Sequence, residues 1–163
     1  MTTRSNSETR AELIKMLGSL TTLSLATVDA GGRPCAAAVY FVSDDDLNVY
    51  FLSAKTTVHG ANMLARPRVA GTAHDEHQEW ASLSGIQLTG LAGPVPALEF
   101  PRAAILYGKK FPFANLLKSA DDAAALAKAM AATTIWKLVP DWIRLIDNSR
   151  GFGYKEEIRL GGE

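Results

Sequence analysis

Short apolar segments rich in β-branched residues, separated by tight turns, limit what this chain can fold into more than any other feature. Residues 23–28 (LSLATV) have strand composition, Asp29-Ala30-Gly31-Gly32 forms a turn, and a second strand is predicted over 35–42. A third strand, 47–52, follows three consecutive aspartates. The sequence contains no Gly-rich strand-to-helix turn of the dinucleotide-binding type. The pattern therefore favours a small barrel over a layered parallel sheet.

Helices are predicted around these strands. Ser5 and Glu8 have capping-box spacing, so a first helix is expected from about Asn6 to Gly18, packed across one end of the barrel. Pro67 ends a short helix at 57–66. The remaining expected elements are strands at 68–74, 86–95 and 135–146, the last with Pro140 at a bulge or edge, helices at 98–108 and 121–132, and a final ordered segment, GFGYKEEIRL.

One domain is expected over residues 1–163, because this length and a hydrophobic content of 47% suffice for a single core. The two later helices form a surface insertion at about 98–132, which is expected to turn an apolar stripe toward the core. The expected fold class is therefore mainly β with peripheral helices.

The charge balance argues against two kinds of partner. Lys plus Arg equals Asp plus Glu at 17 each, so no broad basic field would attract nucleic acid or anionic lipid. The first twenty residues carry scattered charges and no unbroken apolar run, so neither a secretory signal nor a membrane span is predicted there. We expect a cytoplasmic protein. Its single cysteine, Cys35, has no internal disulfide partner and is expected to be a buried strand thiol.

The start of the short helix at 57–66 is the most specific indication of a ligand. Thr56, Thr57 and His59 lie at its first turn, where backbone N–H groups have no partner within the helix and meet the positive end of the helix dipole. Hydroxyls and an imidazole placed there could complete a phosphate site. The alternative is that a threonine simply caps the helix.

Other polar clusters carry less information. His74 and His77 flank the acidic segment DEHQEW, but on a strand end and a turn rather than at the spacing of a helical metal pair, so no metal site is expected. Neither a Ser-His-Asp order nor a paired acid and base stands out elsewhere in the sequence. The catalytic residues are therefore unknown, and any chemistry would belong to a cofactor.

The order and spacing of four segments resemble the pyridoxamine 5′-phosphate oxidase-like family of FMN-binding split barrels, especially its small uncharacterised bacterial branch. The segments are LATVDAGGRPCAAAVYFV, LNVYFLSAKTTVHGANMLARPRVAGTA, GIQLTGLAGPV and VPDWIRLIDNSRGFGYKEE. The resemblance implies a split β-barrel that forms a homodimer, with FMN across the barrel at the subunit interface. Strand backbone would meet the flavin ring, and the following strand-to-helix turn would meet the phosphate.

Carried over by position, the resemblance names a set of cofactor residues. Those expected at the ring are Ala37, Ala38, Val39 and Tyr40, followed on the next strand by Phe51, Leu52 and Ser53. Thr56 and Thr57 match a Ser-Arg pair at the phosphate. The family enzymes place an Arg and a Lys there, whereas this chain has Thr57 and Val58, which leaves Lys55 and His59 as the nearest cations.

Two further positions complete the expected site. Asn62 follows His59 at a spacing that could keep both on one helix face, although it could equally be a plain surface residue. Gln87 lies near the position where the family reaches the partner subunit's flavin. The Trp and Arg that end the true oxidases are not clearly reproduced. Any of Trp136, Trp142, Arg144, Phe152 and Tyr154 could border a pocket, although core or interface packing is expected for the tryptophans.

The leading hypothesis is a small FMN-dependent oxidoreductase that acts on an unidentified small molecule. One alternative keeps the fold but replaces FMN with haem or a deazaflavin; for haem, the histidines to test are His59, His74 and His77. The other alternative is a non-catalytic protein whose pocket holds a flavin or nucleotide without turnover.

Overall fold

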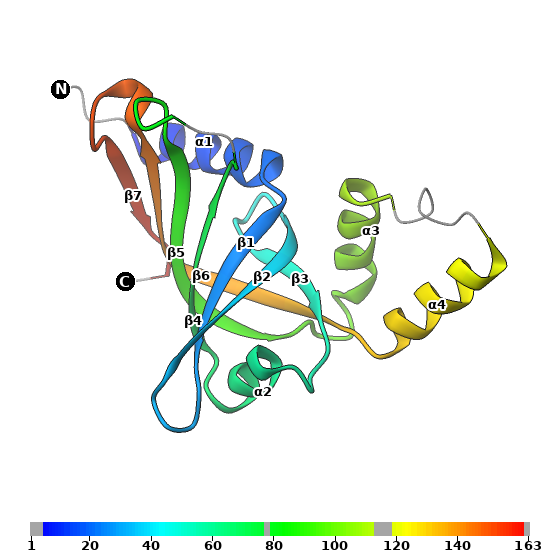
Figure 1. The fold of residues 1–163 in the computed structure, drawn as a ribbon. Helices are drawn as coiled ribbons and strands as arrows, with labels where there is room; N and C mark the ends of the chain where they lie inside the picture. Colours follow the sequence, from blue (N-terminus) through cyan, green and yellow to red (C-terminus); the bar gives the residue numbers. More distant parts are fainter. Residues whose placement is uncertain (1–4, 77–78, 113–118, 162–163) are drawn as a thin grey trace.

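The computed structural model describes residues 5–76, 79–112 and 119–161, and its strands form one antiparallel sheet that closes into a barrel (Figure 1). The order across the sheet is β3-β2-β1-β4-β5-β6-β7, and a further pairing of β3 with β6 closes six strands into the barrel. The strands are β1 (Thr22–Val28), β2 (Pro34–Ser43), β3 (Val49–Ser53), β4 (Arg68–His74), β5 (Ser84–Pro94), β6 (Thr134–Asp147) and β7 (Lys155–Arg159). The mainly β barrel with peripheral helices is confirmed.

The barrel interior is filled by side chains that alternate along each strand. On β1 the buried residues are Leu23, Leu25 and Thr27, while the residues between them face outward. Trp136 of β6 is fully buried and stacks on Phe51 of β3, with ring centroids 6.5 Å apart. This pair therefore packs at the seam where β3 and β6 close the barrel.

Four α-helices accompany the strands: α1 (Asn6–Ser19), α2 (Val58–Ala65), α3 (Phe100–Lys110) and α4 (Ala120–Ala131). The predicted capping box is present at Ser5 and Glu8, and α1 lies across one end of the barrel, where it buries Leu13 and Leu17 (Figure 1). Near the opposite end, α2 follows β3. A short 3-10 turn, Asn148–Arg150, links β6 to β7.

A β-bulge bends the long β5–β6 pair, as Pro140 predicted. Thr89 pairs with Trp142 but the next residue, Gly90, pairs with Pro140, so one residue of β6 is left over. A Cβ atom at Gly90 would lie 2.2 Å from the carbonyl oxygen of Val139. Only glycine fits at this crossing without moving the backbone.

The insertion between β5 and β6 consists of two helices with different surroundings. α3 packs on the outside of β2 and β6 through Ala103 and Tyr107, as its apolar stripe predicted. On α4 the described side chains are exposed, and the side chains of residues 120, 122, 123, 126 and 127, on which a core-facing stripe would fall, lie outside those that the structure describes. Figure 1 shows α4 standing away from the barrel.

Lys110 fastens the end of α3 to the end of α1. Its ammonium donates to the carbonyls of Leu17 (3.2 Å) and Leu20 (2.5 Å) and lies 4.7 Å above the ring of Phe41. These carbonyls belong to the last turn of α1, where the helix dipole favours a cation. Burial nevertheless lowers the pKa of Lys110 to about 8.

We expect Lys110 to make stability depend on pH in the alkaline range. Between its folded pKa of about 8 and the ordinary value of 10.5, the unfolded chain binds more protons than the folded one, so stability rises with pH. In Lys110→Met this contribution is absent. Thermal unfolding of both proteins from pH 7.5 to 9.5 measures this contribution. As the pH rises, the melting temperature of the wild type should increase relative to that of the variant. A constant difference between the two melting temperatures would contradict the lowered pKa of Lys110.

Candidate functional site

One edge of β2 is open at the point where β2 and β3 diverge. Residues 34–40 of β2 pair with β1 on one side. On the other side of β2, β3 pairs only with residues 41–43, and the opposite edge of β3 pairs with β6. The carbonyl of Tyr40 faces this open edge, because it accepts the hydroxyl of Tyr107 at 2.7 Å. Phe41, by contrast, donates its N–H to Thr21 on the β1 side.

This alternation identifies which backbone groups the open edge presents. In an antiparallel strand, the N–H and C=O of one residue point to the same side, and those of the next residue point to the other. Ala36 and Ala38 therefore share the direction of Tyr40, while Ala37 and Val39 direct their backbone groups toward β1. Ala36 was not among the predicted site residues, although the two-residue period of a strand could have indicated it.

The outward side chains beside this edge are small. Ala38 pairs with Ser24, which pairs with Thr72, and Ala36 pairs with Ala26, which pairs with Ala70. Tyr40, at the end of the same row, is 63% exposed. These residues form a continuous surface that we call the outer face: Ser24, Ala26, Ala36, Ala38, Ala70 and Thr72.

The turn between β3 and α2 begins where β3 ends at Ser53. Thr57 is the N-cap of α2: its hydroxyl accepts the N–H of Gly60 at 3.0 Å and donates to the carbonyl of Ala54 at 2.9 Å. A Cβ at Gly60 would lie 2.4 Å from that carbonyl oxygen, so glycine lets the helix sit tightly against the turn. Thr57 therefore caps the helix, whereas the side chains of Lys55 and Thr56 are exposed.

His59 points back into this turn. Its Nε2 lies 2.6 Å from the hydroxyl of Ser53, which is itself 3.1 Å from the hydroxyl of Thr57. Partial burial lowers the pKa of His59 and so favours its neutral form. His59 is thus a hydrogen-bond partner of Ser53, and Lys55 is the exposed basic side chain of the turn.

Asn62 is a buried polar residue of α2. It is 8% exposed, and its side-chain amide donates to the hydroxyl of Thr27 on β1 at 3.1 Å. The surface position considered for Asn62 is therefore wrong. Thr27 pairs with Cys35, which is only half-buried, in contrast to the buried thiol that was expected. The Asn62–Thr27 hydrogen bond thus holds α2 against the barrel, while Lys55 and Thr56 of the preceding turn stay exposed.

Gln87 lies on the outside of β5, where it pairs with Thr72 on one side and Arg144 on the other. Three strand spacings, about 14 Å, separate β5 from β2 across the sheet. Within one chain, Gln87 is therefore not brought to the open edge. The guanidinium of Arg144 binds Glu157 at 3.0 Å and stacks over the ring of Trp142.

A groove of about 500 Å³ continues the outside of the sheet beyond Thr89. Trp142 and Arg159 line it, and Arg68 in its wall is paired with Asp141 at 2.6 Å. Trp142 therefore borders a groove, as the sequence allowed. Arg68 and Arg159 were not predicted, because only the sheet register brings them beside Trp142.

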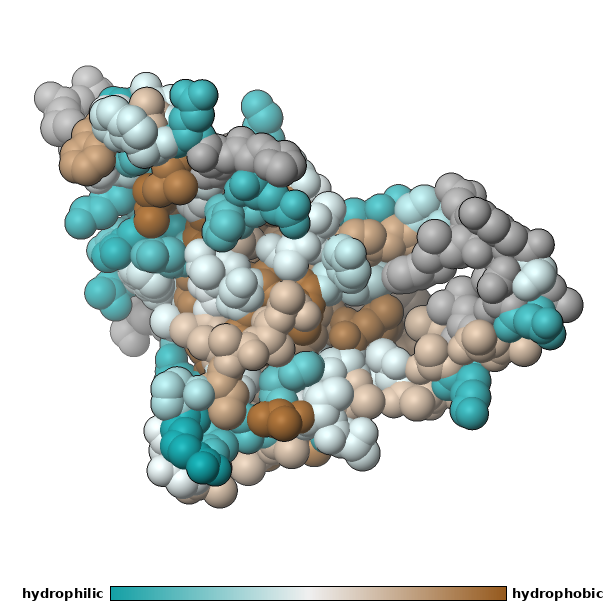
Figure 2. Space-filling model, in the orientation of Figure 1, coloured by the Kyte–Doolittle hydropathy of each residue, from teal (hydrophilic) through white to brown (hydrophobic). Residues whose placement is uncertain are grey.

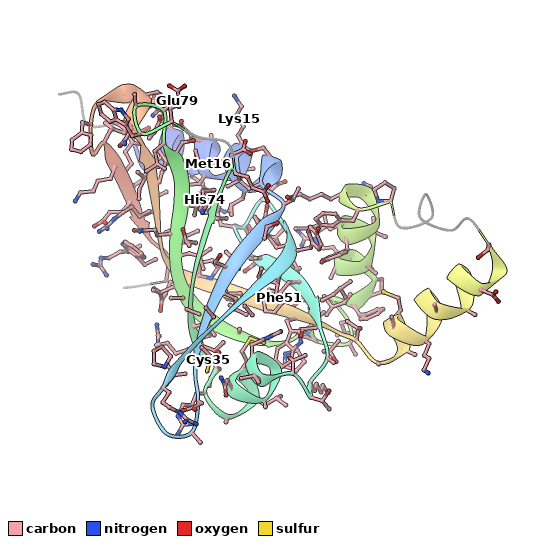
Figure 3. All side chains as sticks on the ribbon, in the orientation of Figure 1. Lys15, Met16, Cys35, Phe51, His74 and Glu79 are labelled. Carbon is pink, nitrogen blue, oxygen red and sulfur yellow. The ribbon has the colours of Figure 1, made fainter. Side chains whose placement is uncertain are left out.

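The histidines do not gather into one site. His74 lies near α1, at the opposite end of the barrel from α2 and His59 (Figure 3). Its Nδ1 is 2.9 Å from the carbonyl of Asp75, while His77 lies outside the described residues. Within 5–76, 79–112 and 119–161, no three His, Cys, Asp or Glu residues gather as metal ligands would.

The fold, the open strand edge and the capped helix after β3 define a split β-barrel. The family model described as pyridoxamine 5′-phosphate oxidase matches residues 9–147, and the chain belongs to this family. A UPF0306 protein of Klebsiella pneumoniae is 31% identical over 121 residues, which are 74% of this chain and 73% of that protein.

Solved structures share the fold at low sequence identity. A putative pyridoxamine 5′-phosphate oxidase from Listeria innocua aligns with a TM-score of 0.65 and 19% identity, covering 86% of this chain and 99% of that one. HutZ from Vibrio cholerae, described as a haem storage protein, aligns with a TM-score of 0.60 and 20% identity, covering 85% and 91%. Proteins that share this barrel thus include both a putative oxidase and a haem storage protein.

Membrane insertion through a helix finds no support in the part of the chain that the structure describes. None of those helices combines the length and the apolar composition needed to cross a bilayer.

Proposed function

We propose that this protein binds FMN and acts as a small flavin-dependent oxidoreductase. The observation that carries the proposal is the open edge of β2, with small side chains on its outer surface and an exposed helix start at the end of the neighbouring strand. A flat ring with carbonyl and N–H groups along one side suits a strand edge that offers the same groups. Alanines at positions 36 and 38 would let such a ring approach closely.

The phosphate would be held by the turn before α2. Lys55 supplies a charge, Thr56 an exposed hydroxyl, and the first amides of α2 point out of the helix start. The turn itself would be held in shape by hydrogen bonds of the Ser53 hydroxyl with Thr57 and His59. The residues present therefore fit a phosphate with one cation where the family oxidases have two.

A homodimer would complete the site. Proteins of this fold commonly form dimers. A second copy could bring its Gln87 to the open edge of β2, together with Arg144 and Trp142 on the strand next to Gln87. A cytoplasmic location suits a reduced, unpaired Cys35. A small-molecule substrate would enter beside the ring.

Two single substitutions separate phosphate binding from helix capping. Thr56→Ala should weaken FMN binding by about fivefold and leave the apo melting temperature unchanged, because Thr56 is exposed and caps nothing. Thr57→Ala should cost about 1 kcal/mol of apo stability through loss of the N-cap. Calorimetric FMN titration and thermal unfolding of the apo proteins measure both. The same loss of affinity in both variants, with equal stability, would contradict this division.

Bound FMN would supply hydride-transfer chemistry, while the protein orients the ring and limits access to it. Anaerobic mixing of the FMN-loaded protein with NADH or NADPH tests turnover by bleaching of the flavin absorbance. Failure of both donors to reduce flavin that is demonstrably bound would favour the non-catalytic binding protein.

Haem is the second candidate ligand, favoured by the fold that the chain shares with HutZ. The neutral imidazole of His59 is the form that ligates iron, although Ser53 now occupies its Nε2. Haemin titration of the wild type, His59→Ala and His74→Ala tests this: a Soret band lost in one variant alone would identify the ligand. A deazaflavin would be recognised by the same strand edge and is tested by direct titration.

A further inference from the structure

The turn before α2 contains a chain of three close polar contacts. The Thr57 hydroxyl lies 2.9 Å from the carbonyl oxygen of Ala54 and 3.1 Å from the hydroxyl of Ser53. The Ser53 hydroxyl in turn lies 2.6 Å from Nε2 of His59. The chain therefore links Ser53, the last residue of β3, to a residue in the first turn of α2.

The protons available to this chain identify the donor in each contact. A carbonyl oxygen only accepts, and each hydroxyl carries one proton. The Thr57 proton goes to Ala54, so the contact between Ser53 and Thr57 takes the Ser53 proton. The third hydrogen must then come from the imidazole of His59, which donates from Nε2 to Ser53. The Ala54 carbonyl, 3.5 Å from the Ser53 hydroxyl, is at the limit of a hydrogen bond, and donation to it would leave the same role to His59.

The same protons determine what the turn can offer to a ligand. With hydrogen on Nε2, the neutral imidazole keeps a lone pair on Nδ1 and gives no proton to an anion. Both hydroxyl protons are used within the chain, and the Thr57 oxygen also accepts the N–H of Gly60. The donors left for a phosphate are therefore Lys55, Thr56 and the first amides of α2.

The chain of contacts lies beneath the surface of the turn. Ser53 is 8% exposed, and its carbonyl accepts the indole N–H of Trp136 at 3.0 Å. Figure 2 shows apolar and hydrophilic residues side by side over α2, so the hydropathy of the surface does not mark this turn. The contact between Ser53 and His59 joins strand and helix behind that surface, and it thereby sets the first amides of α2 relative to the end of β3.

We propose that His59 is the positioning residue of the phosphate turn, and that through Ser53 it makes the site select a phosphate-bearing flavin over riboflavin. A phosphate is held by several donors at once, and their placement must be right to within about 0.5 Å. Riboflavin lacks the phosphate and would meet only the open edge of β2. The inference rests on the proposed function and adds the residue that makes the site specific for the phosphate.

Two substitutions of His59 separate hydrogen-bond donation from shape. Glutamine can place an amide N–H where Nε2 lies, whereas phenylalanine keeps a ring and has no donor. In calorimetric titrations, His59→Phe should raise the dissociation constant of FMN about tenfold and that of riboflavin less than about twofold. His59→Gln should stay within about threefold of the wild type for both flavins. Equal weakening of FMN and riboflavin in His59→Phe, or no rescue by His59→Gln, would overturn the proposal.

Ser53→Ala removes the other end of the same hydrogen bond. It should also weaken FMN binding, and adding His59→Phe to it should cause little further loss, because the link is already broken. Losses that simply add in the double variant would show that the two residues act separately, and would overturn the proposal.

The hydrogen on Nε2 is tested without any flavin. The ring-nitrogen NMR signals of His59 in the apo protein, identified by their absence from His59→Gln, should show a protonated Nε2 and a bare Nδ1 near neutral pH. Hydrogen on Nδ1 instead would overturn the inference whatever the titrations show. The two claims fail differently: a wild type that takes up no FMN refutes the proposed function and the phosphate selection with it, whereas FMN binding that ignores the His59 donor refutes only the inference.

Discussion

Replacing Trp136 with alanine is expected to lower the free energy of unfolding by about 3–5 kcal/mol, the usual cost of removing a large aromatic side chain from a core. Trp136 is 0% exposed, stacks on Phe51 and donates its indole N–H to the carbonyl of Ser53 at 3.0 Å. The substitution would leave a cavity at the closing seam and that carbonyl without its donor. Urea unfolding followed by circular dichroism measures the loss.

Trp80→Ala is the matched control for this prediction. Trp80 is 73% exposed and meets only the ring of Phe152 in an aromatic contact that the structure describes. The same substitution there should change stability by no more than about 0.5 kcal/mol. Should Trp136→Ala fail to fold, Trp136→Phe keeps an aromatic ring against Phe51 but loses the donor and part of the ring volume, so it should unfold at an intermediate urea concentration. Equal losses at positions 136 and 80 would show that the seam is not where the barrel is closed.

The second large effect is expected from Gly90→Ala. The added methyl group would meet backbone atoms, 2.2 Å from the Val139 carbonyl oxygen and 2.8 Å from the Pro140 Cα, so no rotamer change can relieve the clash. We expect a loss of about 3 kcal/mol, at the upper end of the usual cost of overpacking. Thermal and urea unfolding of the purified variant provide the measurement.

Gly93→Ala provides the control on the same strand. A Cβ at Gly93 meets nothing within 4 Å, so this variant should be as stable as the wild type or slightly more stable, because alanine restricts the unfolded chain more than glycine does. Similar stability of the two alanine variants would mean that the bulge opposite Pro140 can slide. In that case, the register of β5 on β6 would not be fixed as described.

Much of the fold could be predicted because the local patterns are strong. The strand predicted over 68–74 matches β4 (Arg68–His74), and the Ser5–Glu8 capping box starts α1 where expected. The closing pair of β3 with β6 could not be predicted from local sequence, since Ser53 and Thr134 are far apart in the chain. That residues 1–163 form a single domain stays a prediction.

The fate of α4 shows what periodicity alone cannot establish. The insertion was expected to turn an apolar stripe toward the core, and α3 does so through Ala103 and Tyr107. On α4 the described side chains are exposed, while residues 120, 122, 123, 126 and 127 lie outside the described side chains. A pattern in the sequence indicates that a surface will be buried, and it does not say against which element.

The turn before α2 was predicted from the sequence, but the contacts of its side chains depend on a geometry that spacing does not reveal. That this turn belongs to the cofactor site stays a prediction. Thr57 caps the helix, and His59 binds Ser53 instead of offering a charge. Both outcomes follow from where α2 turns relative to the end of β3. Which residues touch FMN stays a prediction.

FMN binding is measured by the absorption spectrum of the purified protein during titration with FMN, beside a parallel titration with haemin. We expect saturable uptake of one FMN per chain, with shifted flavin bands, and weaker uptake by Thr56→Ala. No change in the flavin bands at saturating FMN, or a Soret band formed by haemin where FMN does not bind, would contradict it.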